Sequence, residues 1–287
     1  GIEAARNAGS ALVIGAGGGK ALDTARAISS ELGLPIVNCP TLASSDAPCS
    51  ALSVAYTPDG VFERLIFYPR NPDLVLVDTS VVAQAPRRFL VSGMGDALAT
   101  WYEARTVIEA RSPNQLGGAT TMAAQALAKL CCETLYADGL DAATAVDANA
   151  VTPALDRIVE ANTLLSGLGF ESGGLAIAHS VHNGLTAAPP THDYLHGEKV
   201  AFGLLVQLVV EGRPAEEFEQ VRAFCRAVGL PTRLVDLGLG DIDEETIFRI
   251  AELTVAPGET AHHEPFPVTA DLIADGIKAA DGLASRR

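Results

Sequence analysis

Four histidines lie close together in the second half of the chain, at His179, His182, His192 and His196. Residues three apart share one face of a helix, as His179 and His182 would, and the loop after them can fold back to bring His196 towards His179. Two imidazoles and one carboxylate make up a catalytic zinc or iron site that leaves a coordination position open. The spacing therefore predicts a metal centre, but it does not choose among the four histidines.

Asp96 is the carboxylate that best fits such a centre. It lies in the stretch GMGDALATW, among glycine and apolar residues, where an unpaired carboxylate would be costly to bury. The same residues allow a second interpretation, in which Asp96 caps a helix and the histidines lie in surface loops. The sequence leaves both interpretations open.

The stretch VIGAGGGKALDTARAIS, residues 13–29, has the order strand, glycine turn, helix that can hold a phosphate. Backbone amides at the start of such a helix point at the anion, and the helix dipole adds to them. The stretch is not a P-loop, because Ile14 and Ala21 stand where glycine and Ser or Thr are needed. In the usual dinucleotide fingerprint the third glycine would fall on Lys20. The turn is thus of a third type, and a tight turn without a ligand is the alternative.

The loop CPTLASSDAPCSALS follows the second predicted strand and carries small hydroxyl residues and one acid, Asp46. Ligands bind at the carboxyl ends of parallel strands. This position makes the loop a second candidate for ligand binding, and an ordinary polar loop is the alternative.

Two regions of the chain, with different patterns of apolar residues, must position these side chains. Up to about residue 86, short strands alternate with turns and one helix, which predicts a parallel α/β sheet with a hairpin around Pro58-Asp59-Gly60. The nearly continuous apolar run of 73–82 predicts a strand buried on both faces. The expected strands are 11–17, 35–41 and 73–82, the helix is 19–33, and the hairpin is 51–68.

After a boundary near Ala85-Pro86 the spacing of apolar residues is helical throughout. The expected helical segments are 86–110, 120–139, 141–169, 173–188, 197–212, 215–229, 243–255 and 269–284.

The composition excludes several classes of protein. A chain of 287 residues, 48% of them hydrophobic, can hold two domains and bury a large core. Its formal net charge of −15 argues against binding to nucleic acid or anionic membranes, which need a basic face. No apolar run is long enough for a membrane span, and no signal peptide is visible. The five cysteines show neither a metal-binding spacing nor a disulfide framework, so a reducing cytoplasm is expected.

Taken together, the motifs resemble the glycerol dehydrogenase branch of the iron-containing, or group III, alcohol dehydrogenase superfamily. The matching stretches run in the family's order from residue 15 to beyond residue 200, with a looser match in PFPVTADLIADGIKAAD. They include GGGKALDTA, NPDLVLVDTSVVAQAP, GMGDALATWYEAR and HGEKVAFG. ASSDAPCSALS and ESGGLAIAHSVHNGL are specific to the glycerol dehydrogenase branch.

The resemblance implies a dehydroquinate synthase-like fold. An N-terminal Rossmann-like α/β domain with a parallel sheet would span residues 1–86, and an all-α, metal-binding catalytic domain would span residues 87–287. In the family a strand–helix–strand segment precedes the glycine turn, and an acid in it binds the adenosine ribose. The sequence begins at Gly1 within the helix before the first strand, so we expect its sheet to lack the first strands.

The resemblance also implies a role for each candidate residue. Those implied to hold the pyrophosphate of NAD are Gly17, Gly18, Gly19 and Lys20, with Asp23 nearby. Those implied to contact the rest of the cofactor are Thr41 and Ser44 on the nicotinamide side, then Ser50, Leu52 and Tyr56. Asp96, His179 and His196 would bind zinc, with iron as the less favoured metal. Asp46 and His179 would contact the substrate, and His182 would lie behind the metal ligands or near the substrate without binding the metal.

The activity implied is NAD-dependent, zinc-assisted oxidation of glycerol and related vicinal diols to hydroxyketones such as dihydroxyacetone. The metal would lower the pKa of the substrate hydroxyl, and the nicotinamide would take the hydride. Asp46, Asp96, His179 and His196 form the implied catalytic set, in which Asp46 accepts a hydrogen bond from a neighbouring hydroxyl.

Three alternatives accompany this expectation. The first is another polyol or alcohol dehydrogenase of the superfamily. The second is a dehydroquinate synthase-like lyase, which needs more Lys and Arg near the metal than Lys199 alone. The third is a truncated, inactive relative that binds metal or only assembles. Relatives assemble through their helical half, often as octamers, so the resemblance implies a homo-oligomer acting on a small polyol.

Overall fold

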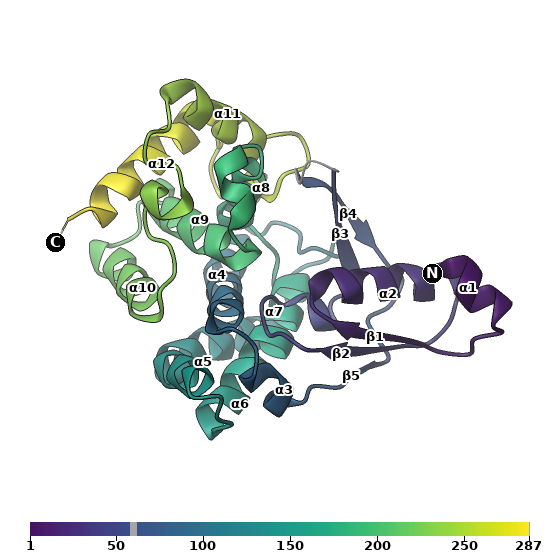
Figure 1. Ribbon diagram of the computed structural model, residues 1–287. Coiled ribbons are helices and arrows are strands. Elements are labelled where there is room, and N and C mark those ends of the chain that lie inside the picture. Colours follow the sequence, from purple (N-terminus) through teal and green to yellow (C-terminus); the bar gives the residue numbers. More distant parts are fainter. Residues whose placement is uncertain (58–61, 287) are drawn as a thin grey trace.

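The computed structural model describes residues 1–57 and 62–286. Two regions follow one another along the chain, a small α/β region and a larger region of helices (Figure 1). The elements of the first region are α1 (Ile2–Asn7), β1 (Val13–Gly17), α2 (Gly19–Leu32), β2 (Ile36–Pro40), η1 (Ala47–Cys49), β3 (Leu52–Tyr56), β4 (Phe62–Phe67), β5 (Leu74–Val75) and α3 (Thr79–Ala83).

The second region begins with α4, directly after Pro86. Its elements are α4 (Arg87–Ala110), α5 (Met122–Asp147), α6 (Pro153–Glu160), η2 (Ala161–Leu165), α7 (Ser166–Gly173), α8 (Ile177–Leu185), η3 (Pro189–Asp193), α9 (His196–Val210), α10 (Ala215–Val228), η4 (Leu234–Leu237), α11 (Glu244–Thr254), η5 (Thr260–His263) and α12 (Ala270–Ala284).

The sheet is parallel, in the order β1-β2-β5, as the sequence predicts. Helix α2 covers one face of it and buries Leu22 and Ala25 there. The helix ends at Gly33, whose φ of 64° is the left-handed conformation that glycine adopts readily at the end of a helix. The expected strand–turn–helix unit is therefore present.

The strand expected over 73–82 is wrong in its length and in its burial. Only Leu74–Val75 pairs with β2, and Asp78 then begins α3 by accepting a hydrogen bond from the backbone N–H of Ser80. Leu74 lies on the face of the sheet opposite to α2, with Ile14 and Val37. Leu74 is 51% exposed and Ile14 is 62% exposed, because in the described chain α2 packs only on the other face.

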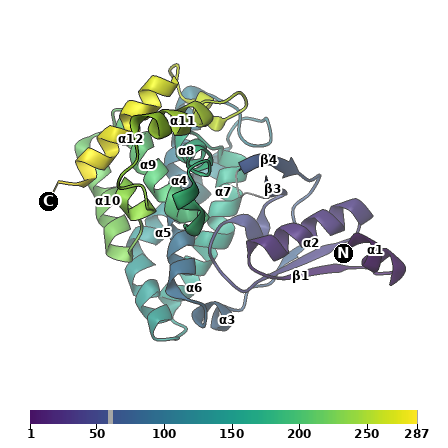
Figure 2. The same cartoon turned by 45° about the horizontal axis from the view of Figure 1, so that its top comes forward.

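Strands β3 and β4 form the expected antiparallel hairpin. Its turn, predicted at Pro58-Asp59-Gly60, lies outside the described residues. Leu52 of β3 packs against Phe170 and Leu175 of the helical region. In Figure 2 the hairpin accordingly lies between α2 and the helices.

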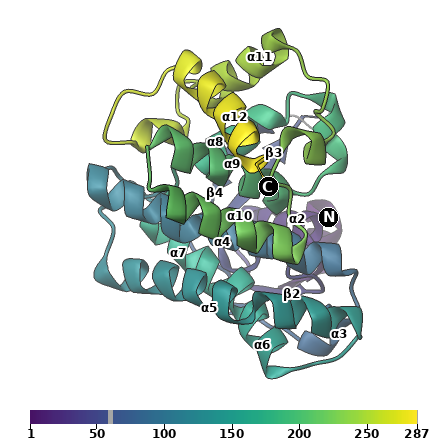
Figure 3. The same ribbon diagram turned by 90° about the vertical axis from the view of Figure 1, so that its left-hand side faces the viewer.

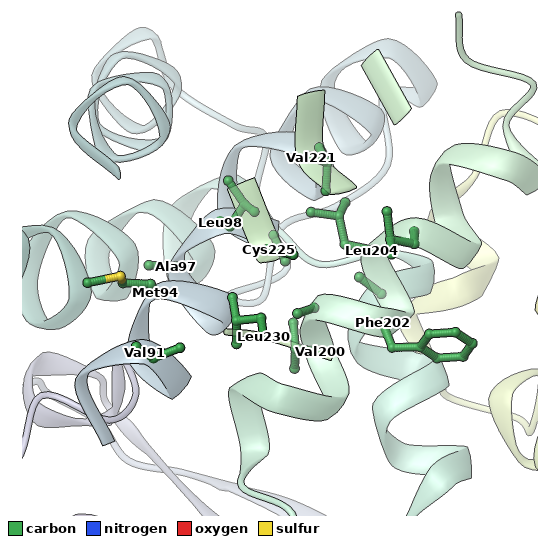
Figure 4. Close-up of a cluster of buried hydrophobic side chains, with 14 of the residues drawn as sticks. Val91, Met94, Ala97, Leu98, Val200, Phe202, Leu204, Val221, Cys225 and Leu230 are labelled. Carbon is green, nitrogen blue, oxygen red and sulfur yellow. The ribbon is translucent and has the colours of Figure 1, made fainter. Parts of the chain in front are cut away.

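Helix α4 is the centre of the helical region, and it packs against α5, α7 and α9 (Figure 3). Every residue from Leu90 to Thr100 is buried, so this part of the helix is enclosed on all sides. Val91, Met94 and Leu98 of α4 and Val200 and Leu204 of α9 belong to the same hydrophobic core, in which Phe202 points away from α4 (Figure 4). This packing fixes the helices that carry the candidate metal ligands.

The segment 141–169, expected to be helical, is divided between α5, α6 and α7. Asn149 adopts a left-handed φ of 51° and Pro153 opens the next helix, which together break the chain between α5 and α6. Between α6 and α7 the backbone makes one turn of π-helix, η2. In the described residues, no helix has both the length and the apolar character to cross a bilayer.

Candidate metal centre and active-site cleft

Asp96 lies in the middle of α4 and its side chain is fully buried. It therefore does not cap a helix, and that alternative is wrong. Helix α9 begins directly beside it: a β-carbon on Gly95 would lie 2.4 Å from the carbonyl oxygen of Gly197, and one on Gly197 would lie 1.8 Å from that of Ser92. Because two glycines let α4 and α9 touch, the first residue of α9, His196, reaches Asp96.

The atoms of Asp96, His179 and His196 that could hold a metal lie within 4.8 Å of one another. The Nε2 atom of His179 is 3.2 Å from Asp96 Oδ1, and the Nε2 atom of His196 is 3.1 Å from the same oxygen. Two imidazole nitrogens and a carboxylate oxygen are donors that suit a catalytic zinc or iron ion. The triad comes from α4, α8 and α9, three elements that the core packing holds together.

Glu103, two turns after Asp96 on α4, orients His179. Its Oε2 is 2.6 Å from Nδ1 of His179, and its Oε1 accepts hydrogen bonds from the backbone N–H groups of Ala176 and His179. A carboxylate on Nδ1 leaves Nε2 to face Asp96 and makes it a better ligand. Burial alone lowers the pKa of His179, but the charges of Glu103 and Asp96 outweigh burial and raise it well above its usual value.

His196 is oriented by His182, whose Nε2 lies 3.0 Å from Nδ1 of His196. The Nδ1 atom of His182 lies 3.0 Å from Oδ1 of Asn183. Burial, reinforced by the neighbouring His196, holds the pKa of His182 well below its usual value. His192 is elsewhere, with Nε2 bonded to the carbonyl of Thr186. The structure thus brings two of the four clustered histidines to Asp96 and places a third behind them.

Asp46, in the loop after β2, is joined to this centre. Its backbone N–H donates to Asp96 Oδ2 at 3.1 Å, and its own Oδ2 accepts from the hydroxyl of Ser166 at 2.9 Å. Burial and the neighbouring Asp96 raise the pKa of Asp46. Burial would also raise the pKa of Asp96, but the charge of His196 and hydrogen bonds from both imidazoles outweigh it and lower that pKa.

A cleft of about 550 Å³ opens on these groups. Asp46, His179 and His196 lie on one side of it, and Glu259 and Thr260 add further polar groups. Its apolar lining includes Leu52, Val54, Leu65, Phe170 and Leu175. A larger hollow of about 1060 Å³, around Arg226 and Arg233, contains none of the predicted site residues.

The glycine turn joins β1 to α2 and lies beside the loop after β2. Gly17 has a φ of 145°, which side chains rarely allow, and Gly18 precedes α2 without a side-chain cap. The backbone N–H of Thr41 donates to the carbonyl of Gly17, and a β-carbon on Gly18 would lie 3.1 Å from Leu42. Apart from its chain neighbours and the backbone of its own helix, no atom in the described chain lies within 4 Å of where a β-carbon of Gly19 would be. The turn thus offers open backbone amides at the start of a helix.

Arg26 links two of the residues predicted to contact a cofactor. Its guanidinium pairs with Asp23 and donates to the carbonyl and hydroxyl of Ser50. Ser50 is fully buried, whereas Leu52 lines the cleft. Ser44 meets α4 through its carbonyl, which accepts from Ser92. The side chain of Tyr56 lies outside the described part of the structure.

Comparison with known proteins identifies relatives of this chain. The sequence profile of iron-containing alcohol dehydrogenases matches residues 1–79. A glycerol dehydrogenase of Thermotoga maritima is 56% identical over 276 residues, which cover 96% of this chain and 76% of the relative. A glycolaldehyde reductase of Halobacterium salinarum is 50% identical over 97% of this chain and 76% of its own length. The crystal structure of a probable glycerol dehydrogenase from Sinorhizobium meliloti superposes with a TM-score of 0.96, at 48% identity, over 99% of this chain and 80% of that one.

The chain belongs to the iron-containing alcohol dehydrogenase family. As a member of this alcohol dehydrogenase family it is an oxidoreductase that acts on a CH–OH group. Its fold, a small Rossmann-like parallel sheet followed by a helical region, is the one expected.

Three residues of this alcohol dehydrogenase fold were missed in the sequence. Glu103 could have been found, because the burial cost that singled out Asp96 applies equally to a second acid on the same apolar helix. Arg26 stands three residues after Asp23, a spacing that permits a helical ion pair. Ser166 gives no local signal, because it meets Asp46 across 120 residues of chain.

Proposed function

We propose that the chain is an NAD-dependent, metal-assisted dehydrogenase that oxidises glycerol and related vicinal diols to hydroxyketones such as dihydroxyacetone. The observation that carries this proposal is the convergence of Asp96, His179 and His196 beside Asp46 in one cleft. Similarity to the Thermotoga maritima glycerol dehydrogenase supports the choice of a polyol as substrate.

The donor set fits a metal. Asp96, His179 and His196 would hold zinc, with iron as the less favoured ion, because these are the borderline donors that both metals accept. When bound, such a metal polarises the substrate hydroxyl and favours loss of its proton. Glu103 and His182 keep both imidazoles turned towards Asp96, so that the ligand atoms are in place before the metal arrives.

The glycine turn fits the pyrophosphate of NAD. Gly17, Gly18, Gly19 and Lys20 would hold it with backbone amides that begin α2, and Gly19 has no neighbour in the described chain to exclude a phosphate. When bound, NAD accepts the hydride. We propose Asp23, Thr41, Ser44, Ser50, Leu52 and Tyr56 as further contributors, with Asp23 and the buried Ser50 acting through Arg26.

Within the cleft, the protein's own side chains would select and orient the diol. Asp46 would accept a hydrogen bond from the hydroxyl next to the reacting carbon, and His179 would contact the reacting end. The apolar wall that includes Leu52 and Phe170 would exclude water from the reacting carbon. A mono-alcohol lacks the second hydroxyl and would leave Asp46 without that partner.

We also propose that the chain divides into domains at residues 86 and 87, with the cleft between them. Residues of both parts line it, among them Asp46 and Leu52 from the first and His196 from the second. We further propose a homo-oligomer that uses the helical region. Met122 and Leu140 on α5 are 88% and 51% exposed, and such an assembly would cover them.

The test is NADH formation by the zinc-loaded protein with glycerol, propane-1,2-diol and propan-2-ol, in wild type and Asp46→Asn. We expect both diols to be oxidised, and Asp46→Asn to lower kcat/KM for glycerol about 100-fold while zinc is retained. Turnover of neither diol would contradict the proposed function. Reduction of glycolaldehyde with NADH, measured in parallel, separates this activity from the one named for the Halobacterium salinarum relative.

A further inference from the structure

We propose that Ser166, supported by Thr100, is a positioning residue that orients the Asp46 carboxylate towards the second hydroxyl of the diol. This role rests on the proposed function, since Asp46 is the residue proposed there to recognise that hydroxyl. It adds a selectivity element that lies behind the cleft and touches neither substrate nor metal.

The backbone of Asp46 is fixed, but its carboxylate needs a second anchor. The N–H of Asp46 donates to Asp96 Oδ2, which sets the distance of the loop from the metal ligands. That bond leaves the side chain free to rotate. The hydroxyl of Ser166 removes this freedom by donating to Asp46 Oδ2 at 2.9 Å. Oδ2 is therefore the oxygen that Ser166 holds, and in this proposal Oδ1 is the oxygen that faces a ligand in the cleft, which Asp46 lines.

Ser166 is itself held by Thr100. Their hydroxyl oxygens are 2.8 Å apart, and both residues are fully buried. A serine hydroxyl has one proton. Because that proton goes to Asp46, Thr100 must donate to Ser166. Thr100 lies one turn after Asp96 on α4, so one helix presents both the metal ligand and the end of this hydrogen-bond chain.

The local backbone brings Ser166 to the loop. Ser166 is the first residue of α7, directly after the π-helical turn η2, and such turns are frequent at functional sites. Within η2, Asn162 donates to the carbonyl oxygens of Ala43 and Leu90 and so joins the Asp46 loop to α4. A β-carbon on Gly167 would lie 2.2 Å from Sγ of Cys49 and 3.0 Å from the carbonyl of Asp46. Glycine at 167 is thus what lets α7 press against the loop.

Loss of the Ser166 hydroxyl should release the carboxylate without disturbing the metal ligands. We expect Ser166→Ala to raise KM for glycerol roughly tenfold, the effect of losing one buried hydrogen bond, with kcat changed less than about threefold. Thr100→Val, of nearly the same shape, should raise KM roughly threefold by loosening Ser166. Neither change should alter KM for propan-2-ol, which has no second hydroxyl.

The experiment measures kcat and KM for glycerol in wild type and in the single variants Ser166→Ala, Thr100→Val and Asp46→Asn. Two double variants are measured as well, Ser166→Ala/Asp46→Asn and Ser166→Ala/Thr100→Val. If Ser166 acts through Asp46, the first double should match Asp46→Asn alone, and Thr100→Val should add nothing to Ser166→Ala. Thr163→Val is the matched control. Thr163 is a buried hydroxyl three residues earlier, and it donates to the carbonyl of Val159 rather than to the loop.

The results separate the two proposals. If wild type oxidises no vicinal diol, the proposed function fails. If wild type oxidises glycerol but Ser166→Ala behaves like Thr163→Val, or if its effect adds fully to that of Asp46→Asn, the positioning role is overturned. Zinc binding by calorimetry confirms that each variant is folded and loaded. Should Ser166→Ala not fold, Thr100→Val and its double with Asp46→Asn decide the question in the same way.

Discussion

Asp96 is fully buried in the middle of a 24-residue helix, whereas Gly18 and Gly19 lie partly exposed at the open end of a small three-stranded sheet. Around Asp96, every side chain of the centre has a partner: Glu103 holds His179, His182 holds His196, and the Asp46 loop holds Asp96 itself. Around the glycines, the described chain offers backbone amides and little else.

This difference indicates that the two sites are prepared in different ways. The metal centre is assembled by the protein, since a buried carboxylate among imidazoles is stable only when each member is in place. In the glycine turn the backbone amides are left without partners in the described chain, and a ligand supplies the missing contacts when it binds. A substitution at the metal centre should therefore affect the other residues of its hydrogen-bond network. A substitution at the turn should affect only cofactor binding.

The largest effect is expected from removing a metal ligand. His196→Ala should abolish zinc binding and lower kcat/KM for glycerol more than about 1,000-fold, because several kcal/mol of charge stabilisation would be lost. Calorimetric zinc titration and NADH formation measure the two losses. His192→Ala is the control, because His192 lies four residues earlier and bonds to Thr186 outside the centre. Equal zinc affinity in both variants would contradict the assigned ligand set.

Removing the carboxylate behind a ligand should have a smaller effect. Glu103→Gln keeps the size of the side chain but takes its charge from Nδ1 of His179, and we expect zinc affinity to fall about 10- to 100-fold. Competition with a zinc chelator gives the affinity. Glu109→Gln, further along α4 and paired with Arg213 at the surface, should leave it unchanged. If the two variants bind zinc with equal affinity, the Glu103 carboxylate does not strengthen zinc binding by His179.

The corresponding change at the glycine turn should affect only the cofactor. Gly17→Ala forces a side chain into a φ of 145°, a strain of about 1–3 kcal/mol, so KM for NAD should rise roughly tenfold or more. Zinc affinity should remain that of wild type. Gly33→Ala, at the other end of α2 with a φ of 64°, should reduce stability without changing KM for NAD. A loss of zinc binding in Gly17→Ala would remove the distinction between the two regions.

The smallest effect concerns pH and stability rather than activity. Both carboxyl oxygens of Glu264 are buried without a hydrogen-bond partner in the described chain. Burial, together with Glu211, Glu103 and Glu109, raises its pKa from 4.5 to about 9, although Arg213 opposes this. The folded chain then keeps a proton that the unfolded chain loses. The free energy of unfolding should therefore fall as pH rises from about 4.5 to about 9, by at most about 1.4 kcal/mol per pH unit.

Glu264→Gln should remove this pH dependence, because an amide resembles the protonated acid. Urea unfolding at several pH values between 6 and 8 measures it, with the exposed Glu31→Gln as control. We expect Glu264→Gln to gain stability relative to wild type as pH rises. A constant difference across the range would show that Glu264 does not hold its proton in the folded chain.

The sequence predicted the strand–turn–helix unit, the hairpin and the helical region well, because apolar spacing and glycine positions are local signals. It failed for 73–82, where the burial of a strand depends on what covers the sheet rather than on the strand itself. Spacing brought Asp96 and four histidines into consideration, and the family resemblance then selected His179 and His196. Ser166 could not be predicted, since its contact with Asp46 depends on how α7 packs against a loop far away in the chain.

The most direct test of the proposed metal centre is NADH formation from glycerol by protein that has been stripped with a chelator and then reloaded with zinc. Activity should disappear on stripping, return with one zinc per chain, and not return in His196→Ala. Full activity in the stripped protein, with its metal content verified by elemental analysis, would contradict the role of the Asp96–His179–His196 centre.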